Sequence, residues 1–290
     1  MHAFITTLAF LVLAIQGHQA IAGTQGVTVD VGGEAVYIPA PTGFHEVSQL
    51  SPETRKFAEM VTPPKNRLLA VFVSEGDLGQ IMKGEDPVLD RYILMQCYRQ
   101  LENSRITGAE FSKLAGQVRQ EQYTLLEKDK ATRDSRIAQM SKTISKEYGI
   151  ALNLKIGETA PLGVFMEKTG AIGFAYLAKC QASAEGQQLD HLVAGATSIM
   201  RVKGNLMYSH VYSKYATAQD LDWVRTTTSV LADQIQAANI GEGTSAKADY
   251  RRTGFDWNKV ITYGIAGAIL AGIIALLKGF AKRKKENHNA

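Results

Sequence analysis

One uninterrupted apolar run near the C-terminus limits how the rest of this chain can fold. Residues 260–277 (VITYGIAGAILAGIIALL) contain no charged side chain. A helix of eighteen residues spans about 27 Å, close to the hydrocarbon thickness of a bilayer. Residues 278–290 follow with five basic residues and one acid, Glu286. The pattern predicts a transmembrane helix at 260–277 and a basic cytoplasmic tail at 278–290.

The formal net charge of +4 belongs to that tail. The chain has 32 Lys and Arg against 28 Asp and Glu, so removing the tail leaves 27 of each for residues 1–259. A nucleic-acid-binding domain needs a basic face to neutralise phosphates. The neutral body therefore predicts no nucleic-acid partner, and the basic tail predicts contact with inner-membrane lipids.

The N-terminus carries a shorter apolar run. Residues 4–15 (FITTLAFLVLAI) would span only about 18 Å as a helix, too little to cross a bilayer. Ala20-Ile21-Ala22 then gives the small-x-small pattern of a cleavage site, so residues 1–22 are predicted to be a signal peptide. The preceding Met-His-Ala has no Lys or Arg, which departs from the usual pattern. The signal peptide and the transmembrane helix together predict an exported, single-pass type I membrane protein.

The absence of an Asn-x-Ser/Thr sequon favours a bacterial envelope over a eukaryotic secretory route. We therefore expect a protein of the bacterial inner membrane, with its N-terminal domain in the periplasm and its C-terminus in the cytoplasm. Within the apolar run, Gly264, Ala268 and Gly272 recur every four residues. Small residues on one helix face let two backbones approach, so these positions are candidates for homodimerisation, although Gly and Ala are common in such helices.

The exported body, residues 23–240, alternates between strand and helix patterns. Residues 27–38 read as a β-hairpin around Gly32-Gly33, and Ser51-Pro52 reads as a helix start. Further strands are expected at 68–73, 92–98, 150–156, 162–166, 172–180, 197–202 and 206–215, and a last helix begins at Thr217. The fold class is α+β, an antiparallel sheet packed by helices. Residues 241–259 lack periodicity and are expected to form a tether.

Residues 109–148 are predicted to be a long helical insertion. They form either a hairpin or one long helix, and residues 127–136 hold seven charges in ten positions. Functionally this segment is a candidate docking arm projecting from the sheet. The alternative is an amphipathic cover whose charged bend faces solvent, which is the usual role of such a charge run.

The layout resembles the PsbP/Mog1-like α/β sandwich domains. The opening hairpin into Ile38-Pro39-Ala40-Pro41-Thr42-Gly43-Phe44, and the closing strands before the helix that contains Trp223, carry this resemblance. It covers most of the exported body, whereas the insertion and the membrane anchor depart from it. Those families include binding and accessory modules, so the resemblance implies an interaction role. It assigns no catalytic residue.

The residues that bear reactive groups are few. Cys97 and Cys180 lie in expected strands, where an oxidising periplasm permits a disulfide and where two buried free thiols are the equal alternative. His45, His191 and His210 form no close ligand cluster, so no metal site is expected. The sequence also holds no phosphate-binding loop and no nucleophile motif, and no cofactor is expected.

One strand carries an unusual row of side chains. In residues 206–215 the period of two places Tyr208, His210 and Tyr212 on one face, a candidate binding face that could stack a ligand or contact a partner. An ordinary sheet face under a helix is the alternative, because aromatic residues are typical of strands.

The sequence therefore favours a membrane-tethered periplasmic binding or accessory protein that acts through a protein partner and has no activity of its own. A first alternative is an envelope hydrolase whose site assembles only in three dimensions, with His210 or His191 as general base. A second is a structural envelope protein that oligomerises through the anchor.

Overall fold

The structure is a computed structural model, and it describes residues 26–85, 87–128, 130–149, 151–184, 187–244 and 248–249. The predicted signal peptide, transmembrane helix and basic tail, with the candidate dimerisation residues Gly264, Ala268 and Gly272, lie outside the described residues. Among the helices that are described, none is long and apolar enough to cross a membrane.

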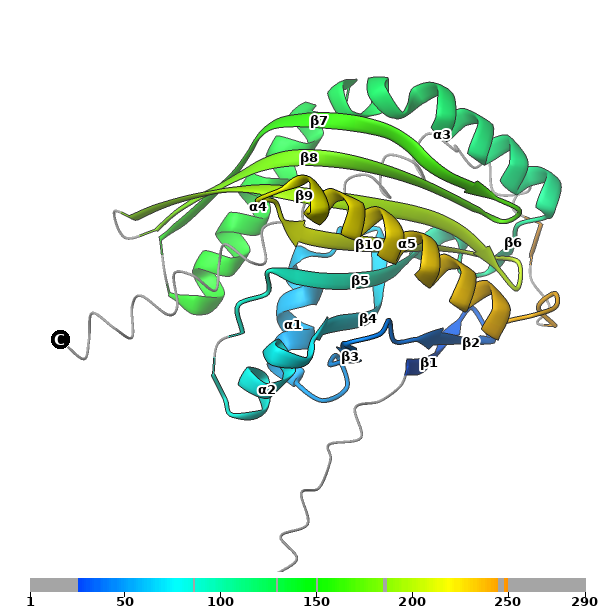
Figure 1. Ribbon diagram of the computed structural model, residues 1–290, viewed down its shortest axis with the longest axis horizontal. Helices are drawn as coiled ribbons and strands as arrows, with labels where there is room; N and C mark the ends of the chain where they lie inside the picture. Colours follow the sequence, from blue (N-terminus) through cyan, green and yellow to red (C-terminus); the bar gives the residue numbers. More distant parts are fainter. Residues whose placement is uncertain are drawn as a thin grey trace, which may run out of the picture.

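One antiparallel sheet organises the domain (Figure 1). Its seven strands lie in the order β3-β4-β5-β10-β9-β8-β7. Their bounds are β3 (Phe44–Glu46), β4 (Asn66–Ser74), β5 (Arg91–Tyr98), β7 (Leu152–Lys168), β8 (Ala171–Ala184), β9 (Gln187–Val202) and β10 (Asn205–Lys214). The predicted antiparallel sheet packed by helices is confirmed, and every strand of the sheet except the short β3 overlaps a predicted one.

The other elements cover or flank this sheet. The hairpin of β1 (Gly26–Val31) and β2 (Glu34–Pro39) forms at the predicted Gly-Gly turn, and β6 (Ser104–Arg105) pairs in parallel with β11 (Ala248–Asp249). The helices are α1 (Pro52–Val61), α2 (Glu75–Met82), α3 (Gly108–Lys128), α4 (Lys130–Tyr148) and α5 (Ala218–Ala238), with a 3₁₀ turn at Arg99–Leu101.

The sheet has a buried core on each face. On the first face, α5 and the β1–β2 hairpin cover side chains that include Met207 and Val211 of β10. Figure 1 shows α5 lying across the sheet on this side. The second face carries Tyr208 and Tyr212 of β10 and packs with residues of α1, α3 and α4. Residues of β10 therefore alternate between two interiors, as a period of two requires.

Local signals in the sequence start the two clearest helices. The Ser51 hydroxyl accepts a hydrogen bond from the Thr54 N–H at 3.1 Å, and Pro52 occupies the first turn of α1. At α5, the Asp220 carboxylate accepts from the Thr217 N–H at 3.0 Å. Each contact satisfies an N–H group that a helix start leaves unpaired, so both predicted caps are confirmed.

Helices α3 and α4 pack on the second face instead of projecting from the sheet. Phe111, Leu114, Val118 and Ile137 are at most 3% exposed and belong to the core that includes the strands. Both helices contact β7. The described side chains of residues 109–148 thus form the amphipathic cover and not the projecting arm, because their apolar stripe has a sheet to bury against.

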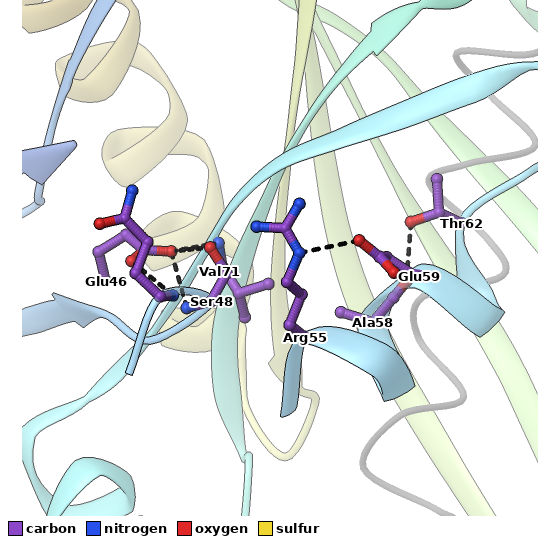
Figure 2. A network of polar contacts seen from close by, with 8 residues as sticks. Glu46, Ser48, Arg55, Ala58, Glu59, Thr62 and Val71 are labelled. Carbon is purple, nitrogen blue, oxygen red and sulfur yellow. Dashed lines mark hydrogen bonds and ion pairs between the residues drawn. The ribbon is translucent and has the colours of Figure 1, made fainter. Parts of the chain in front are cut away.

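A buried carboxylate fixes the start of α1 relative to the sheet (Figure 2). Glu46, only 1% exposed, accepts hydrogen bonds from the Ser48 N–H at 2.8 Å, from the Ser48 hydroxyl and from the Val71 N–H at 3.3 Å. The Arg55–Glu59 pair in the same view is about half exposed on both sides. The buried network stabilises the loop, whereas an exposed pair of this kind contributes little.

The described residues of the predicted tether, 241–244 and 248–249, contact the domain. Arg201 contacts Glu242 at 2.7 Å, Arg105 donates to the Gly243 carbonyl, and Ala248–Asp249 pairs with Ser104–Arg105. The chain therefore leaves the described domain beside β6, at the end of the sheet where β9 turns into β10.

A glycine in the middle of the sheet permits a close aromatic packing. Gly195 lies opposite Tyr176 on β8 and Tyr212 on β10, and a Cβ at this position would overlap the Tyr176 ring. The Tyr176 side chain, 1% exposed, thus needs the space that a missing side chain leaves.

We predict that Gly195→Ala lowers the free energy of unfolding by about 2–3 kcal/mol, because the added methyl overpacks a full core. Gly116→Ala is the matched control, since Gly116 lies inside α3 with open space around its Cα. The control should raise stability by up to about 1 kcal/mol. Urea unfolding of both variants measures the difference, and equal effects would contradict the packing described for Tyr176.

Candidate functional site

The predicted row on β10 exists as one continuous face. The rings of Tyr208 and His210 lie 6.1 Å apart, and those of His210 and Tyr212 lie 6.5 Å apart. Tyr92, from the neighbouring β5, stacks on Tyr212 with ring centroids 4.8 Å apart. Together with Tyr176 of β8, these residues form what we call the tyrosine row, which crosses the centre of the second face.

The tyrosine row is interior in this structure. Tyr208, His210 and Tyr212 are 0% exposed, Tyr176 1% and Tyr92 3%. The open contact surface expected from the sequence is therefore not what the structure presents. Alternation placed the three β10 side chains on one face correctly, but it cannot tell a covered face from a solvated one.

His210 lies in a protected position. Its Nδ1 is 3.1 Å from the Thr197 hydroxyl, and its Nε2 has no hydrogen-bond partner within the described chain. Burial lowers the pKa of His210 to about 3, because the charged ring would lose its hydration. A histidine within reach of a hydroxyl was the feature expected of a hydrolase, but both groups are fully buried and a substrate cannot reach them.

His191, the other candidate base, is half-buried on β9. Burial is the main cause that lowers its pKa, Lys214 lowers it further, and Asp90 and Asp190 oppose the shift. Asp190 itself accepts hydrogen bonds from Gln181 and Gln188. The groups that shift the pKa of His191 are thus the charged side chains of Lys214, Asp90 and Asp190.

The two cysteines are free thiols, so the disulfide alternative is wrong. Cys97 on β5 belongs to the core of the first face, and Cys180 on β8 to that of the second. Strands β10 and β9 separate β5 from β8, which puts the two backbones about 14 Å apart, beyond the reach of a bridge. Burial raises the pKa of Cys180 to about 12, which makes this thiol unreactive. No group of three metal-ligating side chains occurs among the described residues.

A second cluster, which the sequence analysis did not identify, lies at the surface where β3, β5 and α5 meet. The Arg91 guanidinium lies 4.6 Å from the centre of the Trp223 ring, and Phe44 stacks on Trp223 with centroids 5.7 Å apart. Arg91 also donates to Asp220 at 3.1 Å. The side chain of Arg91 is 42% exposed, and Phe44 and Trp223 are partly exposed. We call these four residues the Arg91–Trp223 cluster.

The Asp220 carboxylate connects this cluster to the start of α5. The N–H groups of Ala216 and Thr217, together with Arg91, lower the pKa of Asp220 to about 2. Arg91 is thereby fixed over the indole by an ion pair that persists at neutral pH. The sequence drew attention to Phe44 and Trp223 separately, as parts of the family resemblance. It gave no sign that they meet, or that Arg91 joins them, because the three residues lie on elements far apart in the chain.

Comparisons with known proteins do not assign this chain to a family. No family model matches the sequence, and no curated protein matches it. Solved structures that resemble it include a variant of the protein Mog1, at 11% identity and a TM-score of 0.30, and the Ran-binding protein Mog1p of Saccharomyces cerevisiae, at 10% and 0.26. Each alignment covers 74% of this chain and 92% of the other. At these scores the similarity carries no argument about fold or function.

We predict that His210 makes stability depend on pH. Its pKa is about 3 in the folded protein against an ordinary 6.5, so only the unfolded chain binds the proton in between. The contribution of neutral His210 to the free energy of unfolding is complete above pH 6.5. Below that pH it falls by about 1.4 kcal/mol per pH unit until the pH reaches about 3.

The measurement is urea unfolding at pH 7 and pH 5. On going from pH 7 to pH 5, the free energy of unfolding of His210→Gln should fall by about 2 kcal/mol less than that of the native chain. This difference does not depend on the absolute stability of the variant. His191→Gln is the control for a histidine with a smaller shift. An unchanged pH slope in His210→Gln would show that His210 titrates normally in the folded protein.

Proposed function

We propose that this chain is a membrane-tethered binding or accessory protein of the bacterial envelope. Its domain would lie in the periplasm, held by residues 260–277 in the inner membrane, with the basic tail in the cytoplasm. It would act through a protein partner and catalyse no reaction of its own.

The observation that carries this proposal is the partly exposed Arg91–Trp223 cluster, on a domain that precedes the predicted anchor sequence. Tryptophan and arginine are the residue types most enriched at the energetic centres of protein interfaces. Here both are held in place by Phe44 and Asp220 before any partner arrives, which lowers the entropic cost of binding. The hydrolase alternative gains no support, since His210 and Thr197 lie in the interior.

The membrane assignment predicts that the full chain stays in the membrane fraction after alkaline carbonate extraction. Ile269→Arg places a charge at the centre of the apolar run, which costs about 3 kcal/mol in insertion, and should move most of the chain to the soluble fraction. Reporter fusions check the orientation: a periplasm-active enzyme should work after Asp249 and fail at the C-terminus. Extraction of the native chain by carbonate would contradict the anchor.

The contact surface predicts that Trp223→Ala reduces recovery of a cross-linked partner from membranes by at least tenfold, because a central interface aromatic is commonly worth more than about 2 kcal/mol. Val230→Ala is the matched control, because Val230 is 46% exposed on the same helix, about two turns along from Trp223. Asp222→Lys reverses an exposed charge beside Trp223 without altering the core. Recovery that is unaffected by both Trp223→Ala and Asp222→Lys would exclude this surface.

A further inference from the structure

Strand β9 extends past the end of its neighbour β10. The register between these two strands ends at the Val193–Lys214 pair. One further hydrogen bond joins the Tyr215 N–H to the Leu192 carbonyl at 2.8 Å. Beyond it, residues 187–191 of β9 pair with β8 on one side, whereas no described strand pairs with them on the other. Figure 1 shows this end of β9, which we call the β9 overhang, projecting beyond β10 together with β8.

The backbone groups of Gln188 and Asp190 point to the open side of the overhang. In an antiparallel sheet the N–H and C=O of one residue point to the same neighbouring strand, and successive residues alternate between the two neighbours. Leu192 bonds towards β10, whereas the Arg201 N–H bonds towards β8, at the Gly170 carbonyl. By the same alternation, Gln188 and Asp190 share the direction of Leu192. Their N–H and C=O groups have no backbone partner within the described chain.

The outer edges of the sheet are protected, in contrast to the overhang. At the β7 edge, the N–H groups of Leu152 and Leu154 donate to serine hydroxyls of α4 at 3.0 and 3.1 Å. Further along β7, Pro161 and three shifts of register interrupt the strand. The opposite edge, β3, is only three residues long. Proteins use covered, bulged or short edges to prevent pairing with other chains, and the described overhang has neither a proline nor a shift of register.

The overhang is complementary to a second copy of itself. When two overhangs pair antiparallel about Leu189, Gln188 of each chain lies opposite Asp190 of the other. These two pairs use every outward N–H and C=O group, in about four hydrogen bonds. The exposed Gln188 amide can donate to the carboxylate of the second copy, as it does to Asp190 of its own chain at 3.3 Å. The half-buried, apolar Leu189 meets its own copy on the other face.

The neighbouring registers fit less well. Pairing about Asp190 sets two carboxylates directly opposite each other, and like charges in this position are destabilising. Pairing about His191 sets Asp190 opposite Leu192, whose carbonyl already accepts from Tyr215. Pairing about Gln188 leaves Asp190 opposite residue 186, which precedes the start of β9. Charge and hydrogen bonding therefore favour the register about Leu189.

We propose that two copies of this protein pair through the β9 overhang, edge to edge and antiparallel about Leu189. The pairing continues the sheet of one copy into that of the other across a two-fold axis. It uses only described residues and none of the predicted anchor, so it is independent of the proposed function. The interface is small, since it consists of about four backbone hydrogen bonds and a few side chains, and the dimer forms as the concentration of the protein rises.

Cysteine cross-linking of the full-length chain locates the contact. Leu189→Cys places a thiol on the two-fold axis, where opposite Cα atoms lie about 4.5 Å apart, within the range of a disulfide. Leu192→Cys is the matched control, because Leu192 is the more exposed of the two, at 40%, but its two copies would lie about 20 Å apart. Cys97 and Cys180 are buried. With copper phenanthroline as oxidant, the disulfide-linked fraction should be at least about tenfold larger for Leu189→Cys.

A proline tests the backbone pairing without removing a described hydrogen bond of the sheet. Asp190→Pro deletes an N–H that points outward, and its ring occupies the space of a neighbouring strand. Asp190→Ala is the matched control, because it also removes the carboxylate but keeps the N–H. In sedimentation equilibrium of the full-length chain in detergent, Asp190→Pro should weaken dimerisation at least about tenfold relative to Asp190→Ala. Urea unfolding of both variants shows that each is folded.

Each other outcome overturns this interface. The second copy is excluded by a chain that stays monomeric at the highest concentration, or that cross-links equally through positions 189 and 192. A dimer that survives Asp190→Pro is held by another part of the chain. In cells, a Leu189→Cys chain that cross-links to a different protein instead of to itself has an extended segment of that protein on its edge. Carbonate extraction tests the anchor separately, so the two proposals fail in distinguishable ways.

Discussion

The architecture of this protein depends on a central strand that must be buried on both sides. From Asn205 to Ser213 every residue of β10 is buried, and only Lys214 is exposed. The first face is closed by α5 and the β1–β2 hairpin, which Asn239 joins through hydrogen bonds to both backbone groups of Tyr37. The second face is closed as well, because its side chains belong to one core with residues of α1, α3 and α4.

The two clusters of aromatic residues have different roles because they differ in exposure. The tyrosine row is rigid interior, and its histidine is neutral under ordinary conditions because burial disfavours the charged ring. The Arg91–Trp223 cluster lies at the surface, where Asp220 holds the guanidinium in place.

Much of the fold could be predicted from short-range patterns. The Gly32-Gly33 turn, the Ser51-Pro52 helix start and the Thr217–Asp220 cap depend on neighbours within four residues, so the sequence contains the whole interaction. Whether Cys97 and Cys180 can form a disulfide depended instead on the order of the strands in the sheet. The thiols are kept apart because β10 and β9 lie between β5 and β8, and because the two side chains point to opposite faces of the sheet. Local periodicity predicts neither the strand order nor the face that each thiol shares with the other strands.

By itself, then, the sequence determined most of the strands and helices, the α+β class and the apolar segment that predicts an anchor, because backbone capping, turn geometry and hydrophobic period act over a few residues. Only the tertiary structure decided which faces are covered. It placed Tyr208, His210 and Tyr212 inside, brought Phe44 and Arg91 to Trp223, and paired Ala248–Asp249 with β6. Burial and contact between distant strands arise from sheet order and register, which local pattern leaves open.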